Sequence, residues 1–249
     1  MNARQAVEEW DAQQAAYIAE REQRFAVMID ALQQTLGGDE ATVLDLACGP
    51  GSLARRVLDG LPNARVLAVD YDPVLLDLAR EYLAPYGDRV RVVDADLTDP
   101  SWRSVLDVPR VDAAVSTTAL HWLWPAQLVR LFGDVADLIR PGGVFLDGDH
   151  FRFDARTPHV GRWAADHDRR TQEAAFTAGA LTWQEWWDAI SVRPGHDERA
   201  AERDRRFAGR DGTPPTAVDF RLAALANAGF AEVGTAWQLY DDYVVYAVR

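Results

Sequence analysis

A glycine-rich turn carries the residues of this sequence that are best placed to bind a cofactor. It follows an apolar stretch around Asp45 and reads Ala47-Cys48-Gly49-Pro50-Gly51, and an apolar helical pattern begins directly after it. A strand that turns sharply into a helix leaves backbone N–H groups unpaired at the positive end of the helix dipole, and glycine lets a ligand approach that backbone closely. This glycine turn, residues 47–51, therefore predicts a site for a nucleotide-type cofactor.

A second part of that site is Asp70, which ends the next predicted strand. A carboxylate at this place can accept hydrogen bonds from both hydroxyls of a ribose that lies over the glycine turn. A dinucleotide fingerprint would need glycine at positions 47, 49 and 52, whereas this chain has Ala47 and Ser52. The pattern therefore argues against a nicotinamide dinucleotide.

Two histidines follow predicted strands and are candidates for a general base. His121 comes after the fourth strand and His150 after the fifth. The carboxyl ends of parallel strands face the binding crevice of an open α/β sheet, and a neutral imidazole accepts a proton near pH 7. We therefore expect His121 and His150 to be catalytic. Asp147 and Asp149 beside His150 could hold a divalent metal, but no second carboxylate motif accompanies them, so we expect no metal site.

Alternating strands and helices position these residues. Apolar runs predict seven strands, at Val43–Ala47, Val66–Asp70, Val90–Asp94, Val111–Thr117, Val144–Asp147, Val233–Leu239 and Tyr243–Val248. Helical patterns separate the first five strands, and the one before the fifth covers Gln127–Ile139, which indicates an α/β fold with a parallel sheet. Only three residues separate the last two strands, too few for a parallel crossover, so these strands should form an antiparallel hairpin.

Two segments fall outside this alternation. Residues 5–36 have apolar side chains at helical spacing, which predicts one long helix or two within an N-terminal helical cap at 1–38. Residues 151–215 lack a strand pattern and are rich in tryptophan, so we expect a helical insert between strands 5 and 6 that acts as a substrate lid. The cofactor-binding core then comprises residues 39–150 and 216–249.

Composition narrows the class of protein further. The 249 residues carry a net charge of −13, which argues against a dedicated nucleic-acid binder because phosphate contacts need a basic face. The single cysteine, Cys48, excludes a disulfide framework and a cysteine-based zinc site. The N-terminus is polar and no apolar run reaches the roughly 20 residues that span a bilayer, so we expect a cytoplasmic protein with no signal peptide and no membrane contact. All 26 basic residues are arginine, a bias typical of GC-rich bacterial genomes.

Several motifs in combination resemble those of the class I S-adenosylmethionine-dependent methyltransferases. They are the glycine turn, the strand-end Asp70, Asp94-Ala95-Asp96-Leu97 and Leu138-Ile139-Arg140-Pro141-Gly142-Gly143-Val144. The resemblance covers about residues 40–150 and again 216–249, with overall similarity to trans-aconitate and other small-acid or natural-product methyltransferases. It implies a Rossmann-like seven-stranded sheet whose last strand is antiparallel. The family often carries glycine where this chain has Ala47, and alanine is a frequent variant there.

The resemblance also implies which residues hold the cofactor, S-adenosylmethionine. The backbone of the glycine turn would contact its methionine part, and Asp45 would hold the amino group, directly or through water. An N-terminal helix covers the cofactor in related enzymes, which implies roles for Tyr17 and for Arg21 or Arg24, whose guanidinium would pair with the cofactor's carboxylate.

The adenosine end and the sulfonium would be held by residues that follow the second, third and fourth strands. Asp70 would bind the ribose, Tyr71 would pack on the adenine, and Asp96 with Leu97 would hold the adenine edge. Thr117 and Thr118 would line the space beside the sulfonium. The implied cofactor-binding set is Tyr17, Arg21, Asp45, Ala47, Cys48, Gly49, Gly51, Asp70, Tyr71, Asp96, Leu97 and Thr117.

We therefore expect methyl transfer to a small-molecule acceptor, in keeping with secondary metabolism, by a monomer or homodimer. Two other functions fit the same cofactor site. One is a tRNA-modifying enzyme that uses this cofactor or a carboxylated derivative of it, a reading supported by the arginines at 199, 203, 205, 206 and 210. The other is a non-catalytic, cofactor-binding regulator. Trp183, Trp186 and Trp187 form one aromatic helix face, which either packs the insert onto the core or walls the acceptor site.

Overall fold

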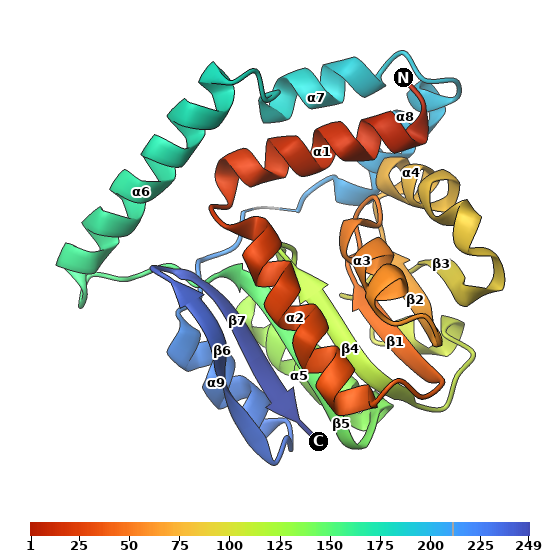
Figure 1. The fold of residues 1–249 in the computed structure, drawn as a ribbon, viewed down its shortest axis with the longest axis vertical. Coiled ribbons are helices and arrows are strands. Elements are labelled where there is room, and N and C mark those ends of the chain that lie inside the picture. Colours follow the sequence, from red (N-terminus) through yellow and green to blue (C-terminus); the bar gives the residue numbers. More distant parts are fainter. Residues whose placement is uncertain (211) are drawn as a thin grey trace.

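A seven-stranded sheet forms the centre of the computed structural model, which describes residues 1–210 and 212–249 (Figure 1). The strands are β1 (Ala41–Leu46), β2 (Ala64–Asp70), β3 (Val90–Asp94), β4 (Val111–Thr117), β5 (Ile139–His150), β6 (Glu232–Leu239) and β7 (Asp242–Val248). Their order is β3-β2-β1-β4-β5-β7-β6, and β7 is antiparallel to both of its neighbours while the other pairs are parallel. The predicted Rossmann-like sheet and its closing hairpin are confirmed.

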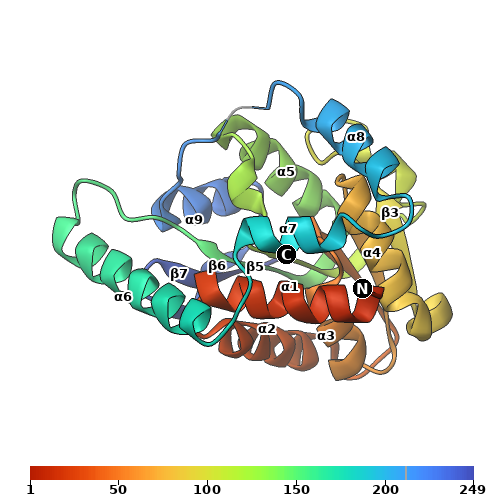
Figure 2. The same cartoon turned by 90° about the horizontal axis from the view of Figure 1, so that it is seen from above.

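Helices cover both faces of the sheet (Figure 2). One face is packed by α2 (Arg21–Leu36), α3 (Ser52–Gly60) and α4 (Pro73–Leu83), and the other by α5 (Pro125–Leu138) and α9 (Val218–Asn227). Strand residues alternate between the two layers, because successive side chains of a strand point to opposite faces. In β1, Val43 packs with the α2–α3 layer, whereas Leu44 and Leu46 pack with the α5–α9 layer. Both faces of the sheet are therefore buried by helices. The place left for a ligand is at the ends of the strands.

The fifth strand is longer than the sequence predicts, and the helix before it begins and ends earlier. Ile139 already pairs with Val111 of β4, and the pairing resumes with Val144 and Ala113 after a shift in register. The Arg-Pro-Gly-Gly turn that we expected to precede the strand is therefore an irregularity within it. The N–H of Gly142 donates to the carbonyl of Arg249 at 2.7 Å, so pairing with the last residue of the chain overrides the local turn signal. At its other end, β5 continues to His150, which pairs with Asp242 of β7.

The N-terminal region forms two helices, which is one of the two arrangements predicted for residues 5–36; the other was a single long helix. Helix α1 (Ala3–Tyr17) ends before a turn in which Glu20 has a left-handed φ of 55°, and α2 follows. α1 crosses the carboxyl edge of the sheet, beside α7 (Trp183–Ile190) of the insert (Figures 1 and 2). This placement closes one side of the space above the strand ends.

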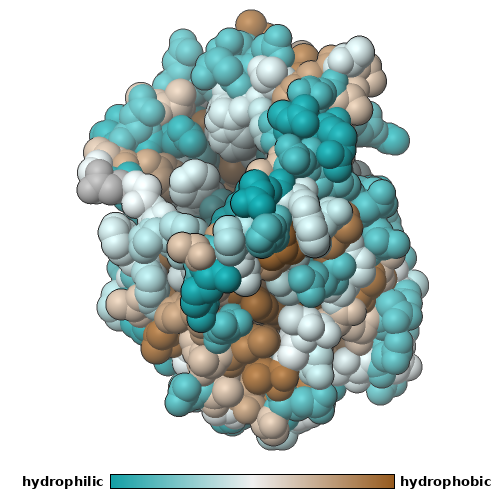
Figure 3. Space-filling model, turned by 90° about the vertical axis from the view of Figure 1, so that its left-hand side faces the viewer, coloured by the Kyte–Doolittle hydropathy of each residue, from teal (hydrophilic) through white to brown (hydrophobic). Residues whose placement is uncertain are grey.

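Residues 151–215 contain no strand among those that the structure describes. Their helices are α6 (Pro158–Thr177), α7 (Trp183–Ile190) and α8 (His196–Phe207), and short 3₁₀ helices elsewhere cover Ala84–Arg89, Trp102–Val105 and Leu120–Trp122. Seen from the side that carries α6, the surface is mostly hydrophilic with smaller hydrophobic patches (Figure 3). No helix in the described part of the chain is both long and apolar enough to cross a membrane. That the insert acts as a substrate lid stays a prediction.

The tryptophans of α7 divide between packing and lining the space below. Trp186 is buried, contacts Trp10 of α1 with ring centroids 4.7 Å apart, and donates its indole N–H to the carbonyl of Ala6 at 2.9 Å. Trp183 and Trp187 flank it and border the large cavity described below. Trp186 therefore packs the insert onto α1, and that Trp183 and Trp187 wall the acceptor site stays a prediction.

The glycine turn adopts left-handed backbone angles at three of its five residues. Gly49 and Gly51 have φ of 55° and 96°, and Ala47 has φ of 55°. A Cβ built on Gly51 would lie 2.8 Å from the side chain of Leu83, so glycine is required there for space as well as for conformation. Ala47 has the same need for a positive φ but carries a Cβ, which explains why a glycine suits its position.

Replacing Ala47 by glycine should raise the free energy of unfolding by roughly 0.5–1 kcal/mol, because relief of the left-handed strain outweighs the added freedom of the unfolded chain. Gly51→Ala is the matched comparison and should lower stability through its contact with Leu83. Urea denaturation of the three proteins measures both effects. A destabilised Ala47→Gly variant would show that the turn is not strained at this residue.

Candidate functional site

One large cavity lies at the carboxyl ends of the parallel strands, where the sheet, α1 and the insert meet. Its volume is about 870 Å³, at the upper end of what small-molecule sites occupy and enough for a cofactor together with a second ligand. The predicted site residues that border it are Tyr17, Arg21, Ala47, Cys48, Gly49, Asp70, Tyr71, Asp96, Leu97, Thr117, His121 and His150. The structure thus brings together residues from six separate stretches of the chain, at 17–21, 47–49, 70–71, 96–97, 117–121 and 150. Their roles toward a ligand stay predictions.

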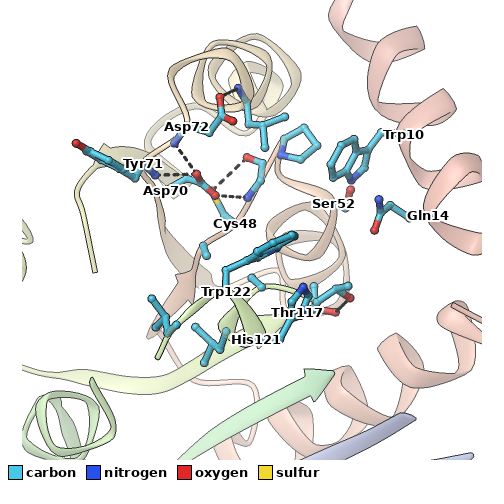
Figure 4. A pocket seen from close by; sticks show the side chains of 18 of the residues that line it. Trp10, Gln14, Cys48, Ser52, Asp70, Tyr71, Asp72, Thr117, His121 and Trp122 are labelled. Carbon is cyan, nitrogen blue, oxygen red and sulfur yellow. Dashed lines mark hydrogen bonds between the residues drawn. The ribbon is translucent and has the colours of Figure 1, made fainter. Parts of the chain in front are cut away.

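Asp70 forms the floor of the cavity next to the glycine turn (Figure 4). Its carboxylate accepts hydrogen bonds from three backbone N–H groups, those of Gly49 at 2.7 Å, Tyr71 at 2.7 Å and Asp72 at 2.8 Å. Burial raises the pKa of Asp70 to about 6, although these donors oppose the shift. Oδ1 accepts two of these bonds and Oδ2 accepts one, so the acceptor site that remains on Oδ2 can still take a hydrogen bond from a ribose hydroxyl.

Asp45 and Gly51 do not border the cavity, unlike the rest of the predicted set. Asp45 is fully buried, and neither of its carboxylate oxygens has a hydrogen-bond partner in the described structure. Burial, reinforced by the charge of Asp70, raises the pKa of Asp45 to about 8, so its carboxyl is protonated near pH 7. Gly51 precedes the first residue of α3 and serves the backbone path of the turn. Direct contact of either residue with a cofactor finds no support in this geometry.

Two arginines, Arg206 in the last turn of α8 and Arg210 just after this helix, reach across the end of the cavity where we expected the adenine. Asp96 accepts from Arg210 with one oxygen and from the backbone and hydroxyl of Thr98 with the other. The guanidinium groups of Arg206 and Arg210 each lie 4.8 Å from the centre of the Tyr71 ring. An adenine that contacts Tyr71 and Asp96 must therefore share them with these arginines or displace them, a competition that the sequence did not reveal.

The two candidate arginines of the N-terminal region differ in what they reach. Arg21 borders the cavity and pairs with Asp11 at 2.9 Å. Arg24 is fully buried below the cavity and donates to the hydroxyls of Thr117 and Thr118 and, at 2.8 Å, to Asp242. Arg21 is thus the one that can meet a cofactor carboxylate, while Arg24 fixes the strand end beside it.

His121 is held at the cavity by the buried carboxylate of Asp149. Both oxygens of Asp149 lie 2.9 Å from Nδ1 of His121, and one also accepts from the backbone N–H of His121 at 3.2 Å. Burial alone would lower the pKa of His121, but the Asp149 carboxylate outweighs it, so the pKa is raised. Because Asp149 takes Nδ1–H, Nε2 is the ring nitrogen that can accept a proton from a ligand. The sequence pattern singled out His121 but not its partner.

The metal site weighed from Asp147, Asp149 and His150 is not formed. Asp147 points away into the core, where it pairs with the fully buried Arg221 at 3.1 Å, and Asp149 is used by His121. His150 borders the cavity, and burial lowers its pKa. Its ring has no hydrogen-bond partner among the described residues, and His121 and His150 do not bond to each other.

Trp122 adds an exposed aromatic surface to this end of the site. Its side chain is 67% exposed, borders the cavity and contacts His121 with ring centroids 5.1 Å apart and the ring planes tilted by 44°. Figure 4 shows Trp122 lying across the cavity, with Tyr71 on one side and Trp10 and Gln14 of α1 on another. A single exposed tryptophan carries no sequence signal, so this residue was not among those predicted.

The sheet order, the glycine turn and the cavity above it define an α/β protein with a nucleotide-type cofactor site at the carboxyl edge of its parallel strands. A family model described as a methyltransferase domain matches residues 43–143. The trans-aconitate 2-methyltransferase of Streptomyces avermitilis is 30% identical over 194 residues, which are 71% of this chain and 69% of that protein. The chain belongs to the class I S-adenosylmethionine-dependent methyltransferases, and S-adenosylmethionine is its cofactor.

Other similarities cover less of the proteins compared. The trans-aconitate 2-methyltransferase of Azoarcus sp. is 31% identical over 163 residues, which are 63% of this chain and 58% of that protein. The apo crystal structure of the S-adenosylmethionine-dependent methyltransferase SibL superposes with a TM-score of 0.58 at 22% identity, over 90% of this chain and 54% of that one. The chain thus spans little more than half of these two proteins, and the likeness to SibL concerns the fold.

Lowering the pH through 6 should weaken the binding of S-adenosylmethionine, up to about tenfold between pH 7 and pH 5, because the ionised Asp70 is the better acceptor for ribose hydroxyls. Asp70→Asn should weaken binding by more than about tenfold at pH 7 and abolish this pH dependence. Calorimetric titrations of both proteins at several pH values measure the effect. Asp30→Asn, at an exposed acid outside the cavity, should behave as the wild type. Unchanged affinity in Asp70→Asn would contradict the ribose assignment.

Proposed function

We propose that this protein transfers the methyl group of S-adenosylmethionine to a small-molecule acceptor whose reacting atom loses a proton to His121. The observation that carries the proposal is the contact between Asp149 and His121 at the wall of the cofactor cavity. A buried carboxylate that orients an imidazole is the arrangement that general-base catalysis requires. A regulator that only bound the cofactor would need the glycine turn and Asp70 but not this pair.

The residues around His121 suit a methyl transfer in which the acceptor attacks in line. When bound, S-adenosylmethionine supplies a methyl group on a positively charged sulfur. Thr117 and Thr118, fixed by Arg24, end the strand beside the glycine turn and would line the sulfur side of the site. Nε2 of His121 would take the proton of the acceptor, and Asp149 would stabilise the imidazolium that forms. Helix α1 and the insert would exclude water from this space.

The charges around the cavity favour a small acceptor over RNA. The arginines that supported a tRNA reading are each paired with a carboxylate: Arg199 with Asp77, Arg203 with Asp72, Arg205 with Glu202, Arg206 with Asp94 and Arg210 with Asp96. Four of these pairs join α8, or Arg210 after it, to carboxylates elsewhere in the chain, and the Arg205 pair lies within α8. Because each arginine has a carboxylate partner, together they do not present a basic face to phosphates. A net charge of −13 works in the same direction.

The substrate of the curated relatives need not be that of this protein. A carboxylate such as those of trans-aconitate is already ionised near pH 7 and accepts a methyl group without giving up a proton. A hydroxyl or an amine in the same place requires a base. The orientation of His121 by Asp149 therefore supports an acceptor whose reacting atom carries a proton.

Methyl-labelled S-adenosylmethionine tests the proposal directly. The protein is incubated with a panel of small phenols, hydroxy acids, amines and carboxylic acids that includes trans-aconitate, and in parallel with bulk tRNA. We expect label in at least one small molecule with a phenolic, alcoholic or amino group and none in tRNA. Label in tRNA would favour the RNA-modifying alternative. Cofactor binding without transfer to any acceptor would favour the regulator.

His121→Gln and Asp149→Asn should each lower kcat toward such an acceptor by about 10²–10⁴-fold, the usual worth of a general base and its orienting partner. The wild-type rate should rise with pH as His121 loses its proton, at a pH above the ordinary histidine value because its pKa is raised. Asp149→Asn should move this limb to lower pH. His159→Gln, at an exposed histidine of α6, is the control. An unchanged pH profile in Asp149→Asn would exclude His121 as the base.

A further inference from the structure

A second, much smaller cavity lies beside the cofactor cavity and shares His150 and Asp168 with it. Its volume is about 10 Å³, roughly the space for one water molecule or one ion. Four segments enclose it: the turn between α1 and α2, the end of β5, helix α6, and the tight turn between β6 and β7. Its lining residues are Ala19, His150, His167, Asp168, Leu239, Tyr240, Asp241 and Asp242.

The donor atoms around this small cavity suit a metal ion. His150, Asp168 and Asp241 each offer one ligand atom, and these three atoms all lie within 4.8 Å of one another. An ion at about 2.0–2.2 Å from each donor needs ligand atoms roughly this close, after a slight contraction. These residues come from β5, α6 and the β6–β7 turn, so only the folded chain brings them together.

A second observation, a buried carboxylate oxygen without a hydrogen-bond partner, also favours a cation at this place. One carboxylate oxygen of Asp242 is buried and has no hydrogen-bond partner in the described chain, and the whole residue is only 4% exposed. The same holds for Nε2 of His167, whose ring borders the cavity from α6. Buried acceptors without partners are rare in folded proteins because each costs free energy. An ion in the small cavity would give both atoms a partner.

The charges nearby leave room for a cation. Arg152 donates through one nitrogen to Asp168 at 3.0 Å and to Asp241 at 2.7 Å, using a single oxygen of each carboxylate. Arg24 donates to the other oxygen of Asp242 at 2.8 Å. Three carboxylates therefore face two guanidinium groups, and Arg152 is not among the residues that line the small cavity. Arg152 thus bridges Oδ2 of Asp168 and Oδ2 of Asp241, and the other oxygen of each carboxylate is left for an ion, while Arg152 orients both groups as outer partners of metal ligands do.

We propose that His150, Asp168 and Asp241 bind a divalent transition-metal ion, with Asp242 and His167 as further ligands. A set that mixes imidazole with carboxylate suits Mn²⁺, Co²⁺ or Zn²⁺ better than Mg²⁺, which prefers oxygen alone. The ion would fasten α6 to the β6–β7 turn at the edge of the cofactor cavity. This site does not depend on methyl transfer. The sequence predicts no metal because, of these five residues, only His150 lies beside a carboxylate pattern, that of Asp147 and Asp149.

Metal titration of the full chain tests this proposal. Protein stripped with a chelator and dialysed is titrated separately with MnCl₂, CoCl₂ and ZnCl₂ by calorimetry, and the visible spectrum of the Co²⁺ sample reports nitrogen ligation. We expect one equivalent to bind, and His150→Gln and Asp168→Asn each to weaken binding by about 10–100-fold. His159→Gln, on the same helix as His167 but exposed, should bind like the wild type.

Two results would overturn the proposal. One is the absence of saturable binding of all three ions to the wild-type chain. The other is binding that is equally strong in His150→Gln and Asp168→Asn, which would place the ion elsewhere on the acidic surface. Circular dichroism establishes that each variant is folded. If His150→Gln does not fold, Asp168→Asn together with His167→Gln decides the matter, because both residues lie on α6 and are only partly buried.

Discussion

The burial of carboxylates at the carboxyl end of β5 and the start of β7 is the constraint on which the functional end of this molecule depends. Asp147, Asp149 and Asp242 are each 4% exposed or less, and a charge taken so far from water needs a partner. Arg221 of α9, His121 after β4 and Arg24 of α2 provide those partners. Each pair joins a strand end to a different element. The need to neutralise buried charge therefore also places His121, Thr117 and Thr118 at the cavity wall.

The opposite end of the cavity follows a different principle, in which backbone groups fix the side chain of Asp70. Left-handed angles at Ala47, Gly49 and Gly51 turn the chain so that it leaves strand β1 and enters α3 within a few residues. Asp70 then accepts from three backbone N–H groups and becomes fixed beside that turn. The cofactor end is thus rigid, whereas the roof over it depends on arginine–carboxylate pairs of α8 that are partly exposed to water and screened by salt.

Local sequence signals predicted the features that local sequence determines. The glycine turn, Asp70 and the closing hairpin rest on spacing within a short stretch of chain, and the sheet that they imply is confirmed. The partner of His121 could not be predicted in this way, because Asp149 is 28 residues away along the chain. The predicted fifth strand ended at Asp147, whereas β5 extends through His150 and so includes Asp149. The occupation of Asp96 by Arg210, 114 residues apart, and the donors around the small cavity likewise arise from tertiary packing. The start of β5 was predicted too late because a Pro-Gly-Gly turn is typical of a loop unless its hydrogen bond with Arg249 is known.

The most direct test of the central claim, that the cavity holds S-adenosylmethionine with its sulfur facing His121, is a crystal structure with the demethylated cofactor, S-adenosylhomocysteine. We expect the ribose hydroxyls on Asp70, the sulfur beside Thr117, and between the sulfur and Nε2 of His121 a space for an acceptor atom. A cofactor whose sulfur faced away from His121, or which lay outside the cavity above the glycine turn, would contradict this account.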